Sequence, residues 1–195
     1  MRKLAISIAT TLLFSLISPT AQSTDLAIWE KLSERNPKGY VLLIRHAYAP
    51  GSGDPANFRL GDCSTQRNLS AEGRTEARAL GEWLKNRDLN ILRIEASRWC
   101  RATETAELLN LGEVIPNNDL NSLFTATAKQ NRIQTAAIKK QIVRHRQTRG
   151  LVIMVGHFVN FSALAGIGLD SGQGVLVRAN SKGQIKVVGY SPTPD

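Results

Sequence analysis

The chain has 195 residues, a length typical of one domain. Hydrophobic residues make up 42% and charged residues 21%, which excludes a wholly disordered chain, a collagen-like repeat and a multi-span membrane protein. The formal net charge of +9 favours anionic partners, and nucleic acid, anionic lipid and phosphorylated small molecules all fit it.

The N-terminus has the pattern of an export signal. Residues 1–3 are basic after the initial Met, and residues 4–17 are apolar but too few to span a bilayer comfortably. Small residues follow at Ala21 and Ser23, with the spacing of a cleavage site. We therefore expect a secretory signal peptide over 1–23 and an exported protein, periplasmic or secreted, with no stable membrane insertion after signal removal. A membrane anchor or a buried helix is the alternative interpretation.

Apolar runs alternate with helical patterns along residues 24–195, which contain no repeat or Gly/Ser-rich linker, so we expect a single domain. Short, fully apolar runs indicate buried strands, and an apolar face repeating every three or four residues indicates a helix. In chain order the pattern predicts a strand at 40–44, a helix at 71–87, a strand at 91–96, a helix ending at 112, a short strand at 114–115, a long basic helix at 128–148, a strand at 151–155, a helix at 158–168, and a hairpin of 175–177 with 185–188. Such alternation predicts an α/β fold, a three-layer αβα sandwich around a mainly parallel central sheet.

Arginine and histidine follow three of the predicted strands. Arg45 and His46 end the first, Arg98 and Arg101 follow the second, and His157 follows the fourth. Ligands of open α/β sheets bind beyond the carboxyl ends of the strands, so we expect these side chains to meet. Arginine forks fit phosphate oxygens, and nearby guanidinium charges keep an imidazole unprotonated and able to attack phosphorus. The pattern favours phosphoryl transfer.

The remaining histidine and the two cysteines have other interpretations. His145 lies between two arginines on the long basic helix, which predicts a solvated surface residue. Cys63 and Cys100 can form a disulfide after export, or they can stay as two free thiols. No cysteine or histidine spacing suggests a metal site.

Four segments resemble those of the histidine phosphatase superfamily, the phosphoglycerate mutase-like enzymes. Residues 43–47 (Leu-Ile-Arg-His-Ala) resemble its Arg-His-Gly signature, and residues 69–77 resemble its Leu-Ser/Thr-x-x-Gly-x-x-Gln/Glu-Ala segment. Residues 97–106 resemble its Ser-Pro-Leu-x-Arg-Ala-x-x-Thr-Ala segment, and residues 155–157 match its second-histidine motif. All four occur in the order found in the family.

The resemblance implies a phosphoglycerate mutase-like fold and a phosphohistidine intermediate on His46. It also implies that Arg45, Arg101 and His157 complete the phosphate pocket, with no metal or organic cofactor.

The sequence departs from the family pattern at positions that bear on the reaction. Ala47 replaces a glycine, and Arg98 replaces a proline, where it is either a substrate contact or a surface arginine. Residues 119–123 lack the glutamate of the mutases, and Phe158 stands where the acid phosphatase branch has an acid. The departures argue against a mutase and favour a phosphatase acting on good leaving groups.

Since both family positions for a proton donor lack a carboxyl group, we consider the carboxylates in the residues after His46. Residues 48–68 are too long and too rich in Gly and Pro for a simple connector, and their only carboxylates are Asp54 and Asp62. We predict that Asp54 is the proton donor and that Asp62 caps the turn at 63–64. The alternative is that Asp54 only shapes its own turn.

The predicted function is therefore an exported phosphomonoester hydrolase, acting on a phosphorylated small molecule or a phosphoprotein. The alternative is a catalytically weak or inactive module that binds a phosphorylated ligand on the same fold. We expect no nucleic-acid partner, because the basic helix at 128–148 lacks interleaved aromatic residues.

Overall fold

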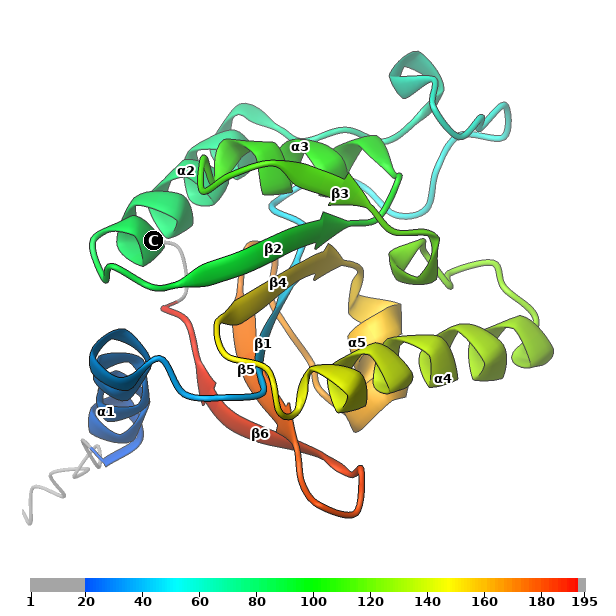
Figure 1. Cartoon of the computed structure of the whole chain (residues 1–195). Helices are drawn as coiled ribbons and strands as arrows, with labels where there is room; N and C mark the ends of the chain where they lie inside the picture. The colour runs from blue at the N-terminus through cyan, green and yellow to red at the C-terminus, as the bar shows by residue number, and fades with distance from the viewer. Residues whose placement is uncertain (1–19, 193–195) are drawn as a thin grey trace, which may run out of the picture.

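The computed structural model describes residues 20–192 (Figure 1). The predicted signal peptide lies outside these residues except for its last four, which begin helix α1 (Thr20–Arg35). In the described part of the chain, no helix is long and apolar enough to cross a membrane.

One six-stranded sheet forms the centre of the fold, with the strand order β3-β2-β4-β1-β5-β6. Strands β1 to β4 are parallel, and the hairpin of β5 and β6 continues the sheet in the antiparallel direction. The strands are β1 (Tyr40–Arg45), β2 (Ile91–Ala96), β3 (Val114–Pro116), β4 (Leu151–Gly156), β5 (Gly174–Ala179) and β6 (Ile185–Tyr190). The central pair, β1 and β4, is almost wholly buried, which explains its uninterrupted apolar sequence.

Helices cover both faces of the sheet (Figure 1). Residues of α1, α2 (Ala71–Lys85) and α3 (Cys100–Leu108) share one hydrophobic core with the sheet. Residues of α4 (Ala128–His145) and α5 (Phe158–Ala165) share the other core. Two short 3-10 helices, η1 (Cys63–Thr65) and η2 (Asn118–Leu120), lie in the connections. The predicted three-layer α/β fold with a mainly parallel sheet is confirmed.

The predicted strands and helices are all present, and the differences lie mainly at helix ends. The helix predicted to reach residue 112 ends at Leu108, and the helix predicted to reach 168 ends at Ala165. Gly166 has a φ of +67°, a left-handed backbone conformation that glycine adopts readily and that stops α5. Helix α1 was not predicted.

The prediction that His145 is solvated is wrong, because only 4% of it is exposed. Its Nε2 atom lies 2.9 Å from the carbonyl oxygen of Gly150, just before β4. The chain turns back so sharply after α4 that the last residue of the helix is enclosed by the start of the next strand.

The start of α2 fixes the connection from β1. Ser70 caps the helix by accepting a hydrogen bond from the backbone N–H of Gly73. The backbone N–H of Ser70 donates to the carbonyl oxygen of Tyr48 at 3.0 Å. A Cβ atom at position 73 would lie 2.1 Å from that oxygen, so the close approach requires glycine.

Candidate active site

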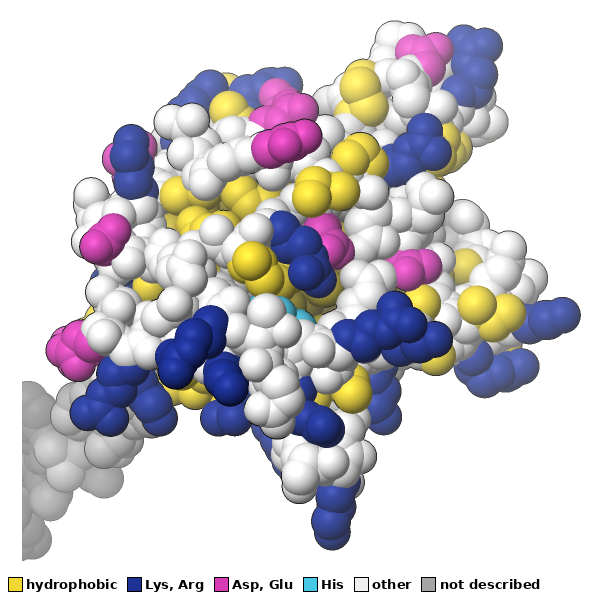
Figure 2. Space-filling model, in the orientation of Figure 1, with side chains coloured by type: hydrophobic (Ala, Val, Ile, Leu, Met, Phe, Trp, Pro, Cys, Tyr) yellow, Lys and Arg dark blue, Asp and Glu magenta, His cyan; other side chains and the backbone are white. Residues whose placement is uncertain are grey.

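A cavity of about 390 Å³ opens at the carboxyl ends of the parallel strands. Four of the predicted pocket residues line it: Arg45 and His46 from the end of β1, Arg101 from α3, and His157 from the start of α5. Its remaining wall comes largely from the residues between β1 and α2, 46–70, which we call the β1–α2 segment. All three histidines of the chain are buried, and Figure 2 accordingly shows only a small area of histidine on the face in view.

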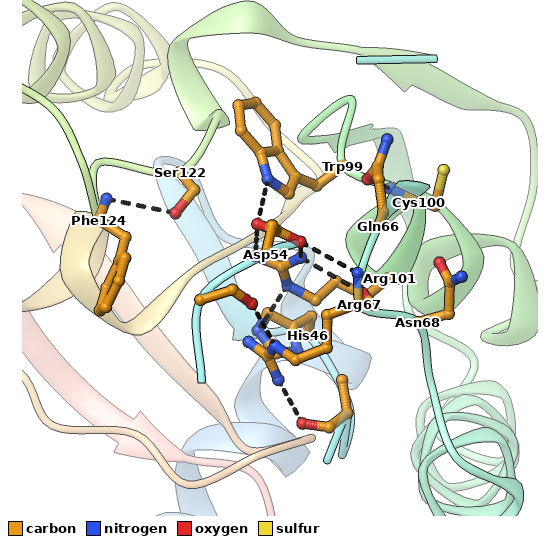
Figure 3. Close-up of polar contacts among 12 residues, drawn as sticks. His46, Asp54, Gln66, Arg67, Asn68, Trp99, Cys100, Arg101, Ser122 and Phe124 are labelled. Carbon is orange, nitrogen blue, oxygen red and sulfur yellow. Dashed lines mark hydrogen bonds and ion pairs between the residues drawn. The ribbon is translucent and has the colours of Figure 1, made fainter. Parts of the chain in front are cut away.

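His46 has the geometry of a nucleophile. Its Nδ1 atom lies 2.8 Å from the carbonyl oxygen of Ala47, which can only accept, so Nδ1 carries the proton of the neutral ring. Its Nε2 atom therefore carries the lone pair of the ring, which accepts a hydrogen bond from Nε of Arg101 at 3.3 Å (Figure 3). Burial and the charges of Arg101, Arg45 and Arg67 together lower the pKa of His46 to about 3, although the hydrogen bond to Ala47 acts in the opposite direction. The ring is thus unprotonated near neutral pH.

His157 lies beside the first histidine as a second neutral imidazole. The ring centroids of His46 and His157 are 5.3 Å apart, and Nε2 of His157 lies 3.0 Å from Oγ of Ser97. Complete burial holds the pKa of His157 well below its ordinary value. A positive charge on His46, when that ring is protonated, and the charges of the arginines act in the same direction on this pKa. A neutral ring with one N–H can donate a hydrogen bond to a phosphoryl oxygen.

Two predicted arginines provide positive charge at the base of the cavity. Arg101 is 3% exposed, and both of its terminal nitrogens bind the carboxylate of Asp54, at 2.7 and 3.3 Å. Arg45 donates from Nη1 to the carbonyl oxygen of Leu169 at 2.9 Å. Its Nε atom is buried without a hydrogen-bond partner among the described residues, which leaves this donor open for an oxyanion.

A third arginine, Arg67, lines the cavity and was not identified from the sequence. It comes from the β1–α2 segment, where its Nε donates to the carbonyl oxygen of Gly53 at 2.8 Å and its Nη1 donates to that of Ala49. No strand end or motif points to it. Its only signal is its place in the long segment that starts at the nucleophile.

The surroundings of Asp54 argue against the predicted role of proton donor. Its carboxylate accepts four hydrogen bonds: two from Arg101, one from the backbone N–H of Arg67 at 3.1 Å, and one from Nε1 of Trp99 at 3.0 Å (Figure 3). Burial raises the pKa of Asp54, but these hydrogen bonds outweigh it and the pKa lies below its ordinary value. A carboxylate held in this way favours its ionised form, which does not suit a proton donor.

The structure also separates the two interpretations of Arg98. Its side chain is exposed and does not line the cavity, and only its backbone N–H makes a local contact, with Oδ1 of Asn121 at 2.9 Å. The expected substrate contact is therefore not found, and Arg98 is a surface arginine.

The two cysteines lie next to the site. A disulfide joins Cys63 of η1 to Cys100, the first residue of α3, with 5.7 Å between their Cα atoms. Asp62 caps the turn before Cys63 by accepting from Ser64, as predicted. Within residues 20–192, no cluster of three or more His, Cys, Asp or Glu side chains could hold a metal ion.

Residues 41–124 match the family model described as "Histidine phosphatase superfamily (branch 1)". Over this range the chain is similar to the histidine phosphatase superfamily. The matched range contains His46, both predicted arginines and the β1–α2 segment. No curated protein sequence matches the chain significantly.

Solved structures share this fold at low sequence identity. The protein histidine phosphatase SixA in complex with tungstate is 16% identical, with a TM-score of 0.56 over 79% of this chain and 97% of SixA. A phosphoserine phosphatase from Entamoeba histolytica in complex with 3-phosphoglyceric acid is 12% identical, with a TM-score of 0.61 over 79% and 97% of the two chains. The product of an open reading frame of Mycobacterium tuberculosis is 15% identical, with a TM-score of 0.62 over 82% of this chain and 100% of its own.

Proposed function

We propose that this protein is a phosphomonoester hydrolase that transfers a phosphoryl group to Nε2 of His46. The observation that carries the proposal is the unprotonated Nε2 atom at the base of a cavity lined by arginines. The match of residues 41–124 to the model of the histidine phosphatase superfamily supports it.

The residues suit a two-step displacement. The Nε donor of Arg45, unpaired within residues 20–192, and the guanidinium of Arg101 bind phosphoryl oxygens, and His157 donates a hydrogen bond to another phosphoryl oxygen. Nε2 of His46 attacks phosphorus, the P–O bond breaks, and the leaving group departs with the electron pair. Water then attacks the phosphohistidine, its proton passes to solvent, and the N–P electron pair returns to His46 as phosphate forms.

The lining of the cavity supports substrates with good leaving groups. Among the described residues that line it, Asp54 is the only one with a carboxyl group, and that group is fully engaged. An alkoxide needs a proton as it departs, whereas a phenolate needs one far less. Three exposed aromatic side chains, Tyr48, Phe124 and Phe158, also line the cavity and offer apolar surface to an aromatic leaving group.

The first experiment traps the intermediate. The protein is mixed with an aryl phosphate carrying labelled phosphorus and quenched in alkali, which preserves phosphohistidine. We expect acid-labile label on the wild-type protein and none on His46→Ala. Label that persists in His46→Ala would refute the nucleophile.

A module that binds a phosphorylated ligand without turnover is the second candidate, and the lack of a free carboxyl group in the cavity favours it. Binding of inorganic phosphate to a protein that hydrolyses no aryl phosphate and retains no label would establish this alternative.

We also propose that the protein is exported. The basic and apolar segments at 1–3 and 4–17 support export, and a disulfide suits an oxidising compartment. N-terminal sequencing of protein from the periplasm and the medium tests this, with a mature N-terminus near residue 24 expected. Protein found only in the cytoplasm with an intact N-terminus would contradict it.

A further inference from the structure

We propose that Asp54 is a positioning residue, which fixes the guanidinium of Arg101 against His46. We further propose that the disulfide between Cys63 and Cys100 holds the β1–α2 segment in the place where Asp54 can do this. The inference rests on the proposed hydrolase function and assigns Asp54 a role other than proton donation.

The three nitrogens of the Arg101 guanidinium contact two different partners. Both terminal nitrogens bind the carboxylate of Asp54, an arrangement that fixes the plane of the group as well as its position. The third nitrogen, Nε, is thereby directed at Nε2 of His46. A phosphoryl group approaching His46 thus meets a guanidinium edge that is already oriented.

Asp54 is itself held from two further sides (Figure 3). The backbone N–H of Arg67 and the indole N–H of Trp99 donate to its two oxygens. The ring of Phe58 stacks on Trp99, with 5.0 Å between centroids and 21° between planes. The carboxylate therefore cannot turn away without breaking contacts with both the β1–α2 segment and the residue before α3.

The disulfide joins these two parts of the chain close to Arg101. Cys100 directly precedes Arg101 on α3, and Cys63 belongs to the β1–α2 segment that carries Asp54. A second link lies alongside, since Oε1 of Gln66 accepts a hydrogen bond from the backbone N–H of Cys100 at 2.9 Å. Residues near Asp54 include Gly51 and Gly53, both with positive φ, a backbone conformation that glycine adopts readily.

The position of Asp54 gives its removal a distinctive consequence. Its negative charge lies beside a site for an anion, where it opposes phosphate binding. A neutral replacement removes this repulsion and at the same time frees Arg101 from its fixed orientation. Turnover should fall while phosphate binding is kept, whereas general damage to the fold would weaken both.

The test compares Asp54→Asn with the wild-type protein on an aryl phosphate and an alkyl phosphate. We expect kcat to fall by roughly 10- to 100-fold on both, the scale of a misplaced reacting geometry, with an unchanged or lower inhibition constant for inorganic phosphate. Glu104→Gln is the matched control, because it breaks another arginine–carboxylate pair on α3, with Arg74, and leaves the cavity intact. Its kcat should stay near the wild-type value.

Three outcomes of these kinetic assays would overturn the positioning role. An unchanged kcat shows that Arg101 keeps its orientation without Asp54. A loss of kcat confined to the alkyl phosphate indicates that Asp54 acts as a proton donor. Phosphate inhibition that weakens together with kcat indicates general damage to the fold. NMR of the guanidinium gives a readout that needs no activity: rotation of the Arg101 group should be slow in the wild type and fast in Asp54→Asn. Slow rotation in both refutes the proposal, whereas a wild-type protein inactive on both phosphates refutes the proposed function instead.

Reduction and alkylation of the folded wild-type protein test the disulfide. We expect kcat to fall several-fold, and the double variant Cys63→Ser, Cys100→Ser should show the same lower value with or without reductant. Gln66→Ala removes the hydrogen bond to the backbone N–H of Cys100 and keeps the disulfide. It therefore provides a second test if the reduced protein unfolds, and it should also lower kcat. Full activity in the alkylated protein, or in folded Gln66→Ala if reduction unfolds the chain, refutes this part of the proposal.

Discussion

Acid should destabilise this protein through the buried imidazole of His46. In the folded state its pKa is about 3, against an ordinary value of 6.5 for an exposed histidine. Between these two values the unfolded chain binds a proton at this residue and the folded chain does not. Stability is therefore fully present above about pH 6.5 and is lost progressively as the pH falls toward the folded value.

The magnitude follows from the two pKa values. Between about pH 7.5 and about pH 5, proton uptake by the unfolded state alone lowers the free energy of unfolding by about 2 kcal/mol. His157, whose pKa is also lowered by burial, acts in the same direction. The effect of His46 can be isolated with His46→Asn, in which an amide N–H can still donate to the carbonyl oxygen of Ala47.

Urea unfolding at the two pH values measures the effect. The wild-type protein should lose about 2 kcal/mol more stability than His46→Asn on going from about pH 7.5 to about pH 5. The other titrating groups are the same in both proteins. Their contributions therefore cancel, to a good approximation, when the loss of stability in His46→Asn is subtracted from the loss in the wild type.

Equal losses in the two proteins, within about 0.5 kcal/mol, would refute the reasoning. His46 would then titrate near its ordinary pKa in the folded state and be largely protonated at about pH 5. A protonated ring has no lone pair on Nε2, so the proposed nucleophile would be available only at higher pH.

Three further predictions concern the pocket and its supports. Arg45→Ala should lower kcat on an aryl phosphate by roughly 10²–10³, the effect of losing one preorganised donor, and a loss below about threefold would place Arg45 outside the reaction. Gly73→Ala forces a Cβ within 2.1 Å of the Tyr48 carbonyl oxygen and should lower stability by about 1–3 kcal/mol in thermal unfolding, whereas Gly168→Ala, with no neighbour nearer than 3.8 Å, should cost little. Reducing the disulfide, which spans 37 residues, should cost up to about 4 kcal/mol in urea unfolding, and an unchanged midpoint would contradict the link.

Local pattern determined most of the architecture of this protein. The apolar run at 40–44 and the serine at position 70, directly before a helical pattern, are local features of the sequence. The buried strand and the capped helix could therefore be predicted from the sequence. The rule that ligands bind beyond the carboxyl ends of parallel strands was then enough to predict that Arg45, His46 and His157 meet. These features depend on short-range periodicity and on one general property of parallel sheets.

Only the tertiary structure decided the electrostatic state of individual side chains. The donors that keep Asp54 ionised come from residues 13, 45 and 47 positions away, and no local pattern indicates that they converge. The place of Arg67 in the cavity and the burial of His145 arise in the same way, from contacts between segments that the fold brings together. A pKa depends on the charges, hydrogen bonds and solvent within a few ångströms, and folding sets all three.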